Sequence, residues 1–159
     1  MSEVRMRLAR VDDAPAVSRL ARRVVRRWIV PDQPPAAVIV LEESLRSSVI
    51  REKIRTGQRF HLAFVGGALA GVAAVRNHSH VFQLFVGTRY QGQGIARKLW
   101  DRLRKDCIRR AATGAFTLNA APGAVPVYLH MGFVIDHDPG RVRGKVIAAP
   151  MIYRVDDHE

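Results

Sequence analysis

The sequence is poor in cysteine, with Cys107 alone among its 159 residues. A single cysteine cannot form an internal disulfide and fits a reducing compartment, so we expect a cytoplasmic protein. The start of the chain, residues 1–5, is charged and lacks the apolar run of a signal peptide. No stretch approaches the ~20 apolar residues that a membrane-spanning helix needs. These absences predict a chain without a disulfide framework, a secretion signal or a membrane segment.

Acidic and aromatic residues are also scarce. The chain has 14 Asp and Glu against 26 Lys and Arg, a formal net charge of +12, and only 7% aromatic residues. Such a charge suits nucleic acid, an anionic membrane or an acidic cofactor. Because the basic residues are spread along the chain with few aromatics among them, a nucleic-acid surface is the less favoured interpretation. The length and 48% hydrophobic content predict one domain over residues 1–159, and we predict no metal site.

One stretch predicts chemistry because it reads as strand, turn and helix. The apolar run over 81–86 is typical of a buried strand, and from Ile95 apolar residues recur every four positions, as in a helix with one buried face. Gly87, Gly92 and Gly94 lie between them. The first turn of a helix has unpaired N–H groups and partial positive charge, and glycine lets an anion approach the backbone. The pattern predicts a phosphate or pyrophosphate ligand, although the glycines alone fit a plain strand-to-helix turn equally well.

Two common phosphate motifs do not fit this turn. A P-loop needs Gly-Lys-Ser/Thr, whereas Gly94 is followed by Ile95 and Ala96. A dinucleotide-binding fingerprint needs a third glycine or alanine where Arg97 stands. The segment Gln91-Gly92-Gln93-Gly94-Ile95-Ala96 instead resembles the Gln/Arg-x-x-Gly-x-Gly/Ala signature of the GCN5-related N-acetyltransferases.

This resemblance implies a coenzyme site for acetyl-CoA. Backbone amides from Gly92 to Arg97 are implied to cradle its pyrophosphate, and the strand before the turn to offer main-chain groups to the pantetheine arm. Asn119 matches a coenzyme-contacting asparagine only loosely, because its spacing to the tyrosine of the next motif is longer than usual. The implied coenzyme-binding residues are Leu84, Phe85, Val86, Gln91, Gly92, Gln93, Gly94, Ile95, Ala96, Arg97 and Asn119.

A second motif, Ala-x-x-x-Tyr-x-x-x-Gly-Phe, occupies residues 124–133 and resembles another signature of the same family. There the tyrosine lies beside the coenzyme sulfur, so the resemblance implies that Tyr128 protonates the departing thiolate. A phenol of pKa ~10 is able to donate to a thiolate of pKa ~8.5 when the two are in contact. The alternative is a tyrosine that simply packs on a short helix.

The attacking amine must lose a proton, and histidine titrates near neutrality. His80, or His78 in the turn before it, is therefore the candidate base, and two exposed loop histidines are the alternative. The resemblance also makes Trp28, Glu42 and Glu43 candidates for acceptor contact. Cys107 falls on the apolar face of the predicted helix, where a thiol stays neutral and is a poor nucleophile.

The hydrophobic pattern places helices at 14–28, 36–55 and 95–107, and strands at 4–11, 59–65, 68–75, 81–86, 114–119, 133–135 and 145–155, with a loop at 139–141. Gly66-Gly67 predicts a hairpin between the second and third strands. The resemblance implies an α/β (α+β) fold with a mixed, mostly antiparallel sheet flanked by helices. A splayed pair of parallel strands is implied at the coenzyme site.

The expected activity is acetyl transfer from acetyl-CoA to a primary amine of a small molecule or peptide by direct attack. A backbone N–H from Phe85 or Val86 is expected to polarise the thioester carbonyl. Two alternatives stay open: a non-catalytic acyl-CoA sensor of the same fold, and a basic nucleic-acid-binding domain. The sequence leaves the acceptor unidentified, and a homodimer, frequent in the family, stays open as well.

Overall fold

The computed structural model describes residues 3–138 and 145–158. In this part of the chain, strands form one seven-stranded sheet in the order β1-β2-β3-β4-β5-β7-β6. All neighbouring pairs are antiparallel except β4 and β5, so the predicted mixed sheet with one parallel pair is confirmed. The strands are β1 (Val4–Leu8), β2 (Arg59–Val65), β3 (Ala68–Arg76), β4 (His80–Val86), β5 (Ala115–Ala120), β6 (Val134–Ile135) and β7 (Ala149–Arg154).

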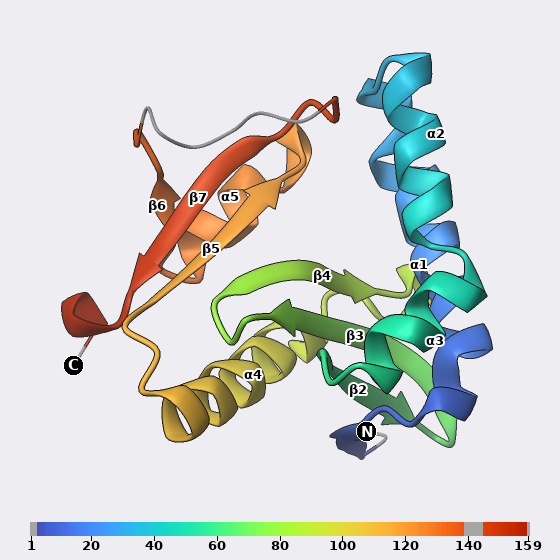
Figure 1. Ribbon diagram of the computed structural model, residues 1–159, viewed down its shortest axis with the longest axis horizontal. Coiled ribbons are helices and arrows are strands. Elements are labelled where there is room, and N and C mark those ends of the chain that lie inside the picture. The colour runs from blue at the N-terminus through green and yellow to red at the C-terminus, as the bar shows by residue number, and fades with distance from the viewer. Residues whose placement is uncertain (1–2, 139–144, 159) are drawn as a thin grey trace.

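Helices cover both faces of the β1–β4 half of this sheet, as Figure 1 shows. The helices of the described residues are α1 (Ala14–Trp28), α2 (Pro35–Ser44), α3 (Ser47–Arg55), α4 (Ile95–Ala111) and α5 (Val125–His130), of which α5 lies beside the β5–β7 half. One core cluster packs α4 against one face, and a second packs α1 and α3 against the other. Side chains on the two faces of β4 therefore lie in different environments, one under α4 and the other under α1 and α3.

The packing of α4 follows from its sequence. Its residues at four-residue spacing are buried as predicted, since Ile95, Leu99, Leu103 and Cys107 all face the sheet. Gly71 of β3 permits this close approach, because a Cβ there would lie 2.9 Å from Leu99 Cδ1 and 3.1 Å from the Phe85 carbonyl oxygen. The start of α4 is thereby fixed against the end of β4.

A gap opens between the parallel strands β4 and β5. Their register contains only His80 opposite Thr117 and Val81 opposite Leu118. Directly after this pairing, β4 contains a β-bulge: Val81 pairs with Val75 and Gln83 with Ala74, which leaves Phe82 as the extra residue. From there the two strands diverge, and Figure 1 shows the β1–β4 half and the β5–β7 half spreading apart like a V. The predicted splay thus begins at the bulge.

Among the described residues, Gln33 bridges the wide end of the V. Gln33, between α1 and α2, donates from Nε2 to the Ile147 carbonyl at 2.8 Å and accepts from the Ile147 N–H at 2.7 Å. Ile147 shortly precedes β7, so these two hydrogen bonds connect the helical side of the molecule to the β5–β7 half.

The single helix predicted over 36–55 was wrong, because two helices occupy this region. Arg46 has extended backbone angles, φ −61° and ψ 140°, and separates α2 from α3. The break lets the buried Leu45 carbonyl accept a hydrogen bond of 2.5 Å from Ser18 Oγ of α1. The terminal strands β1 and β7 are also shorter than predicted, and the predicted loop at 139–141 lies outside the described residues. Across the described ranges, no helix has the length and apolarity needed to cross a membrane.

Candidate active site

The glycine-rich turn at the start of α4 has the geometry of an anion cradle. Gly92 and Gly94 have φ values of +79° and +77°, which L side chains rarely adopt. A Cβ built on either residue meets nothing within 4 Å, so the space beside both is open. The turn therefore exposes its backbone where side chains would otherwise cover it.

The N-terminus of α4 adds donors to this turn. The Lys98 N–H donates to the Gly94 carbonyl at 3.1 Å, so the N–H groups of Ile95, Ala96 and Arg97 precede the hydrogen-bond ladder of the helix. Gly94 makes no side-chain cap, and the first turn contains no acidic residue. Unpaired amides, the helix dipole and the nearby positive charges all favour a bound anion. The residues present thus fit a phosphate or pyrophosphate.

Gln91 and Arg97, both predicted to bind the coenzyme, differ in what holds their side chains. The Gln91 amide donates to the Val86 carbonyl at 3.1 Å, which fastens the turn to the end of β4. The Arg97 side chain is about half exposed, and its Nε lies 3.9 Å from Asp101, so the guanidinium extends into solvent beside the turn. Gln91 shapes the cradle from within, whereas Arg97 adds positive charge at its edge.

Main-chain groups of β4 face the gap at alternate residues. The Gly87 N–H donates to the Ala70 carbonyl of β3 at 2.8 Å. In an antiparallel pair the direction alternates, so the N–H of Phe85 also faces β3, while those of Leu84 and Val86 face the gap. Of the two residues predicted to polarise the carbonyl, Val86 is thus the one whose N–H is available on that side.

Tyr128 lies on α5, which follows β5 at the diverging end of the V. Its ring packs edge-on against Phe133 with 5.8 Å between centroids, and the side chain is partly buried. Burial raises the pKa of Tyr128 to about 12. The phenol therefore keeps its proton at neutral pH and is able to act only as a donor of that proton.

His80 stands at the narrow end of the V. Its Nδ1 lies 2.9 Å from Thr117 Oγ1 across the parallel pair. Side chains alternate along a strand, and Val81 packs on the α4 side, so His80 lies on the α1–α3 face. Asn119 is exposed on the face of β5 opposite Leu118 and Ala120, which pack under α4. The structure thus separates Asn119 from the face that carries the glycine turn.

A hollow on the α1–α3 face of β4 was not predicted from sequence. It has a volume of about 230 Å³ and is lined by Val25, Leu41, Ser44, Leu45, Lys53, Gln58, Arg76, Phe82, Gln83 and Phe85. Gln83, a polar residue inside the apolar strand run 81–86, was the one signal available beforehand. Its side chain is only 3% exposed.

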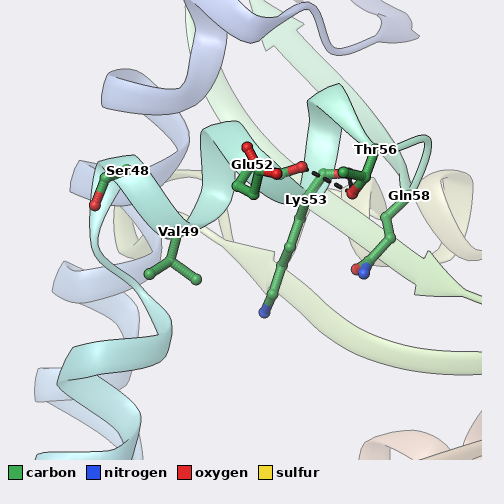
Figure 2. A pocket seen from close by; sticks show the side chains of 6 residues that line it. All are labelled: Ser48, Val49, Glu52, Lys53, Thr56 and Gln58. Atoms are coloured by element: carbon green, nitrogen blue, oxygen red, sulfur yellow. Dashed lines mark hydrogen bonds between the residues drawn. The ribbon is translucent and has the colours of Figure 1, made fainter.

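A second, more open hollow of about 430 Å³ lies along α3 and is lined by α3 and the residues after it. Figure 2 shows Lys53 and Gln58, which belong to both hollows, extending to the same side of the helix. No strand contributes to this larger hollow among the described residues, so it lies away from the β4–β5 gap.

The residues predicted from sequence to contact the acceptor, namely Trp28, Glu42 and Glu43, interact with other side chains. Glu42 accepts two hydrogen bonds from Arg26 at 2.8 and 3.0 Å, and Glu43 pairs with Arg46 at 3.3 Å. Trp28 is 46% exposed and donates to Thr88 Oγ1 at 3.4 Å. The described residues that line the smaller hollow include neither the two glutamates nor Trp28.

Cys107 is buried under the sheet, and burial raises the pKa of its thiol to about 11. The thiol is therefore neutral and unreactive at physiological pH, as its position in the sequence predicted. In the part of the chain that the structure describes, no group of three or more His, Cys, Asp or Glu side chains is arranged to hold a metal ion.

Comparison with known families agrees with this geometry. Residues 29–155 match the family model described as an acetyltransferase (GNAT) domain. The match spans most of the chain, so the chain belongs to the GNAT acetyltransferase family, and the resemblance stated from its motifs is confirmed. A search of the curated proteins finds no match.

Solved structures share the fold at low sequence identity. A GCN5-related N-acetyltransferase from Rhodopseudomonas palustris is 19% identical, with a TM-score of 0.79 and 98% of each chain covered. The PaiA N-acetyltransferase from Thermoplasma acidophilum, in complex with coenzyme A, is 13% identical, with a TM-score of 0.77 over 96% of this chain and 99% of that one.

The putative acetyltransferase YncA from Salmonella typhimurium, solved with its cofactor acetyl-CoA, is 18% identical, with a TM-score of 0.68 over 99% and 97% of the two chains. Two of these three neighbours therefore contain coenzyme A or its acetyl ester, in agreement with acetyl-CoA as the co-substrate of the family.

Proposed function

We propose that this protein transfers the acetyl group of acetyl-CoA to a primary amine by direct attack. The observation that carries the proposal is the open glycine turn at the N-terminus of α4, placed at the diverging end of the β4–β5 gap. A pyrophosphate on this turn directs the rest of the coenzyme into the gap. Membership of the GNAT acetyltransferase family supports the same chemistry.

Each predicted coenzyme-binding group has a distinct task in this proposal. The amides from Gly92 to Arg97, with Gln93 among them, hold the pyrophosphate, and the gap-facing main chain of Leu84 and Val86 holds the pantetheine arm. Phe85 contributes through its side chain, which lines the hollow on the other face. Asn119, exposed on the far strand, is proposed only as a contact at the edge of the gap.

The reaction joins the amine nitrogen to the acetyl carbonyl carbon and breaks the carbon–sulfur bond. The N–H groups of Leu84 and Val86 both face the gap, and that of Leu84 lies nearer the bulge. We therefore assign the Leu84 N–H to the carbonyl oxygen that gains charge, in place of the Phe85 or Val86 donor predicted from sequence. Before attack, the ammonium gives one proton through water to His80, which later releases it to solvent. After attack, the nitrogen gives a second proton to solvent, while Tyr128 protonates the departing thiolate and regains a proton from solvent. Because the phenol is fully protonated at neutral pH, it is ready for this role without prior activation.

The test combines coenzyme binding with turnover. Calorimetry should give a binding isotherm with coenzyme A, and release of free thiol from acetyl-CoA should depend on an added amine. Absence of any heat with coenzyme A would overturn the proposed site. Binding without thiol release across a broad amine panel would instead identify a sensor of acyl-CoA, the alternative that shares this fold.

A further inference from the structure

The β-bulge in β4 brings two consecutive side chains onto one face. Val81, Leu84 and Val86 pack with the α4 cluster, while Phe82 and Phe85 pack with the α1–α3 cluster. Because Phe82 is the extra residue, Gln83 shares its face, and both side chains line the 230 Å³ hollow. The hollow therefore adjoins the gap at the point where β4 and β5 separate, on the face opposite α4.

Two residues that line this hollow have buried acceptor atoms without partners. The Oε1 atoms of Gln58 and Gln83 are buried and receive no hydrogen bond from the described residues. Gln83 is nearly completely buried, at 3% exposure, on a strand that is otherwise apolar. A buried acceptor without a donor is costly, and a ligand N–H bound in the hollow removes that cost. An amine provides such an N–H.

The charged side chains in the described lining of the hollow are both positive. Lys53 Nζ lies 4.8 Å from the centre of the Phe82 ring, and Arg76 lines the same space. Among the described lining residues none is Asp or Glu. Partial burial and then the charge of Arg76 lower the pKa of Lys53, and no carboxylate among the described lining residues compensates the two positive charges. A bound carboxylate supplies that charge, whereas a polycationic amine is repelled.

The remaining walls and the size restrict the ligand further. Apolar side chains form half of the described lining, namely Val25 of α1, Leu41 of α2, Leu45 just after α2, and Phe82 and Phe85 of β4. The volume of about 230 Å³ equals roughly eight water molecules at ~30 Å³ each. This space admits a molecule of amino-acid size and excludes a folded polypeptide segment of several residues.

We infer that the acceptor is an amine of amino-acid size that carries a carboxylate and an apolar side chain. Its amine N–H donates to Gln83 Oε1 at the bulge, its carboxylate contacts Lys53 and Arg76, and its side chain packs on Phe82 and Phe85. The acceptor thus enters from the α1–α3 face and the thioester from the α4 side. This inference rests on the proposed acetyl transfer.

The first experiment uses the unmodified protein and matched amines. Thiol release from acetyl-CoA is measured with L-leucine, L-methionine and L-phenylalanine, and with the amine that each becomes when its carboxylate is removed. We expect kcat/KM to be at least about tenfold higher for the best amino acid than for its decarboxylated amine, as for hydrogen bonds to charged groups. Equal or reversed values would overturn the inference while leaving acetyl transfer itself established.

Variants then separate the two ends of the ligand. Lys53→Met should raise KM for the amino acid about tenfold or more and leave the decarboxylated amine unchanged. Gln83→Leu should lower kcat/KM for both amines, because both present the same N–H. Lys105→Met, an exposed lysine on α4, is the matched control and should change neither.

Coenzyme A affinity and the thermal unfolding midpoint are recorded for each variant, so that a folding defect is distinguished from a lost contact. A Lys53→Met protein that folds, binds coenzyme A and treats both amines like the unmodified protein would contradict the carboxylate site. Failure of the unmodified protein to bind coenzyme A or to release thiol with any amine would count against the proposed function instead.

Discussion

The two ligand regions of this molecule differ in what builds them. The glycine turn before α4 is made of backbone from one continuous stretch of about ten residues, and its donors are main-chain N–H groups. The hollow on the other side of β4 is made of side chains from α1, α2, α3, β3 and β4 and from the residues that follow α2 and α3. We propose that the first region binds the coenzyme common to the family, and that the second binds the acceptor particular to this chain.

This difference indicates which of the two regions can change its ligand specificity by substitution. A backbone cradle restricts sequence to glycine at positions with positive φ, so substitution there is costly. The walls of the hollow are side chains on a scaffold that stays folded when they vary in kind. Experiments on the two regions should therefore give different kinds of effect, on coenzyme affinity in one and on acceptor choice in the other.

The largest effect is expected at Tyr128, the proposed proton donor to the departing thiolate. Tyr128→Phe removes the phenol proton and keeps the ring that packs on Phe133, so kcat should fall about ten- to a thousandfold. Coenzyme A affinity and the unfolding midpoint should hardly change. A steady-state assay with a substrate for which chemistry limits the rate measures this, and an unchanged kcat would remove Tyr128 from its role.

Gly94→Ala tests the backbone cradle alone. A φ of +77° strains alanine, and its methyl group occupies the space proposed for a phosphate oxygen. We expect coenzyme A affinity to fall about ten- to a hundredfold, measured by calorimetry, because the strain of ~1–2 kcal/mol adds to the steric conflict. Gly114→Ala is the control, since Gly114 has no positive φ and a Cβ there meets nothing within 4 Å. Equal affinities for the two variants would argue against a ligand at this turn.

The packing of α4 against β2, which is part of the scaffold, should weaken in acid. His61 is buried, its Nε2 lies 3.1 Å from Asp106, and burial lowers its pKa from about 6.5 to about 4. A lowered folded-state pKa favours the neutral imidazole, so this stability is complete above pH 6.5 and is lost as pH falls toward 4. We expect urea titrations to show a loss of about 2–3 kcal/mol over that window.

Protonation of Asp106 should lower the free energy of unfolding further at lower pH. Its hydrogen bonds with Arg59 and Arg110 outweigh the cost of burial and lower its pKa to about 2, so its share of the stability is lost as pH falls below about 4. His61→Phe should flatten the profile between pH 6.5 and 4 while leaving this lower part. An unmodified protein equally stable at both ends of the first window would contradict the assignment.

The smallest of these effects concerns the base. His80→Gln should lower kcat/KM about tenfold and weaken its dependence on pH near neutrality, because an imidazole is replaced by a group that does not titrate. Glutamine retains a hydrogen-bonding group for Thr117. His78→Gln, in the turn just before β4, provides the matched comparison. If the His78 variant shows the altered pH profile instead, the base belongs to the turn.

Sequence predicted the strand, turn and helix around Gly92 and Gly94 because each step there has a local cause: an apolar run, glycines and a four-residue repeat. The hairpin at Gly66-Gly67 was also confirmed, with positive φ at both glycines. The parallel pair and its splay were predicted through the family resemblance rather than from the residues themselves. Local patterns thus specify elements, and the resemblance supplied their arrangement.

The features missed from sequence all depend on distant partners. The break between α2 and α3 is held by Ser18, which is 27 positions before Leu45. The bulge at Phe82 appears only when β4 is aligned with β3, and it alone explains why Gln83 faces the hollow. Lys53 and Arg76 meet there from separate elements. The periodicity of a single segment does not indicate which distant residues that segment contacts.

The double hydrogen bond between Gln33 and Ile147 has a mechanical consequence. Together with the strand pairing at His80 and Thr117, it fastens the two arms of the V at both extremities. Because each of these exposed hydrogen bonds contributes only about 0.5–1.5 kcal/mol, the connection favours one spacing of the two arms without locking it. A molecule that enters between the arms therefore meets a spacing that folding has already favoured.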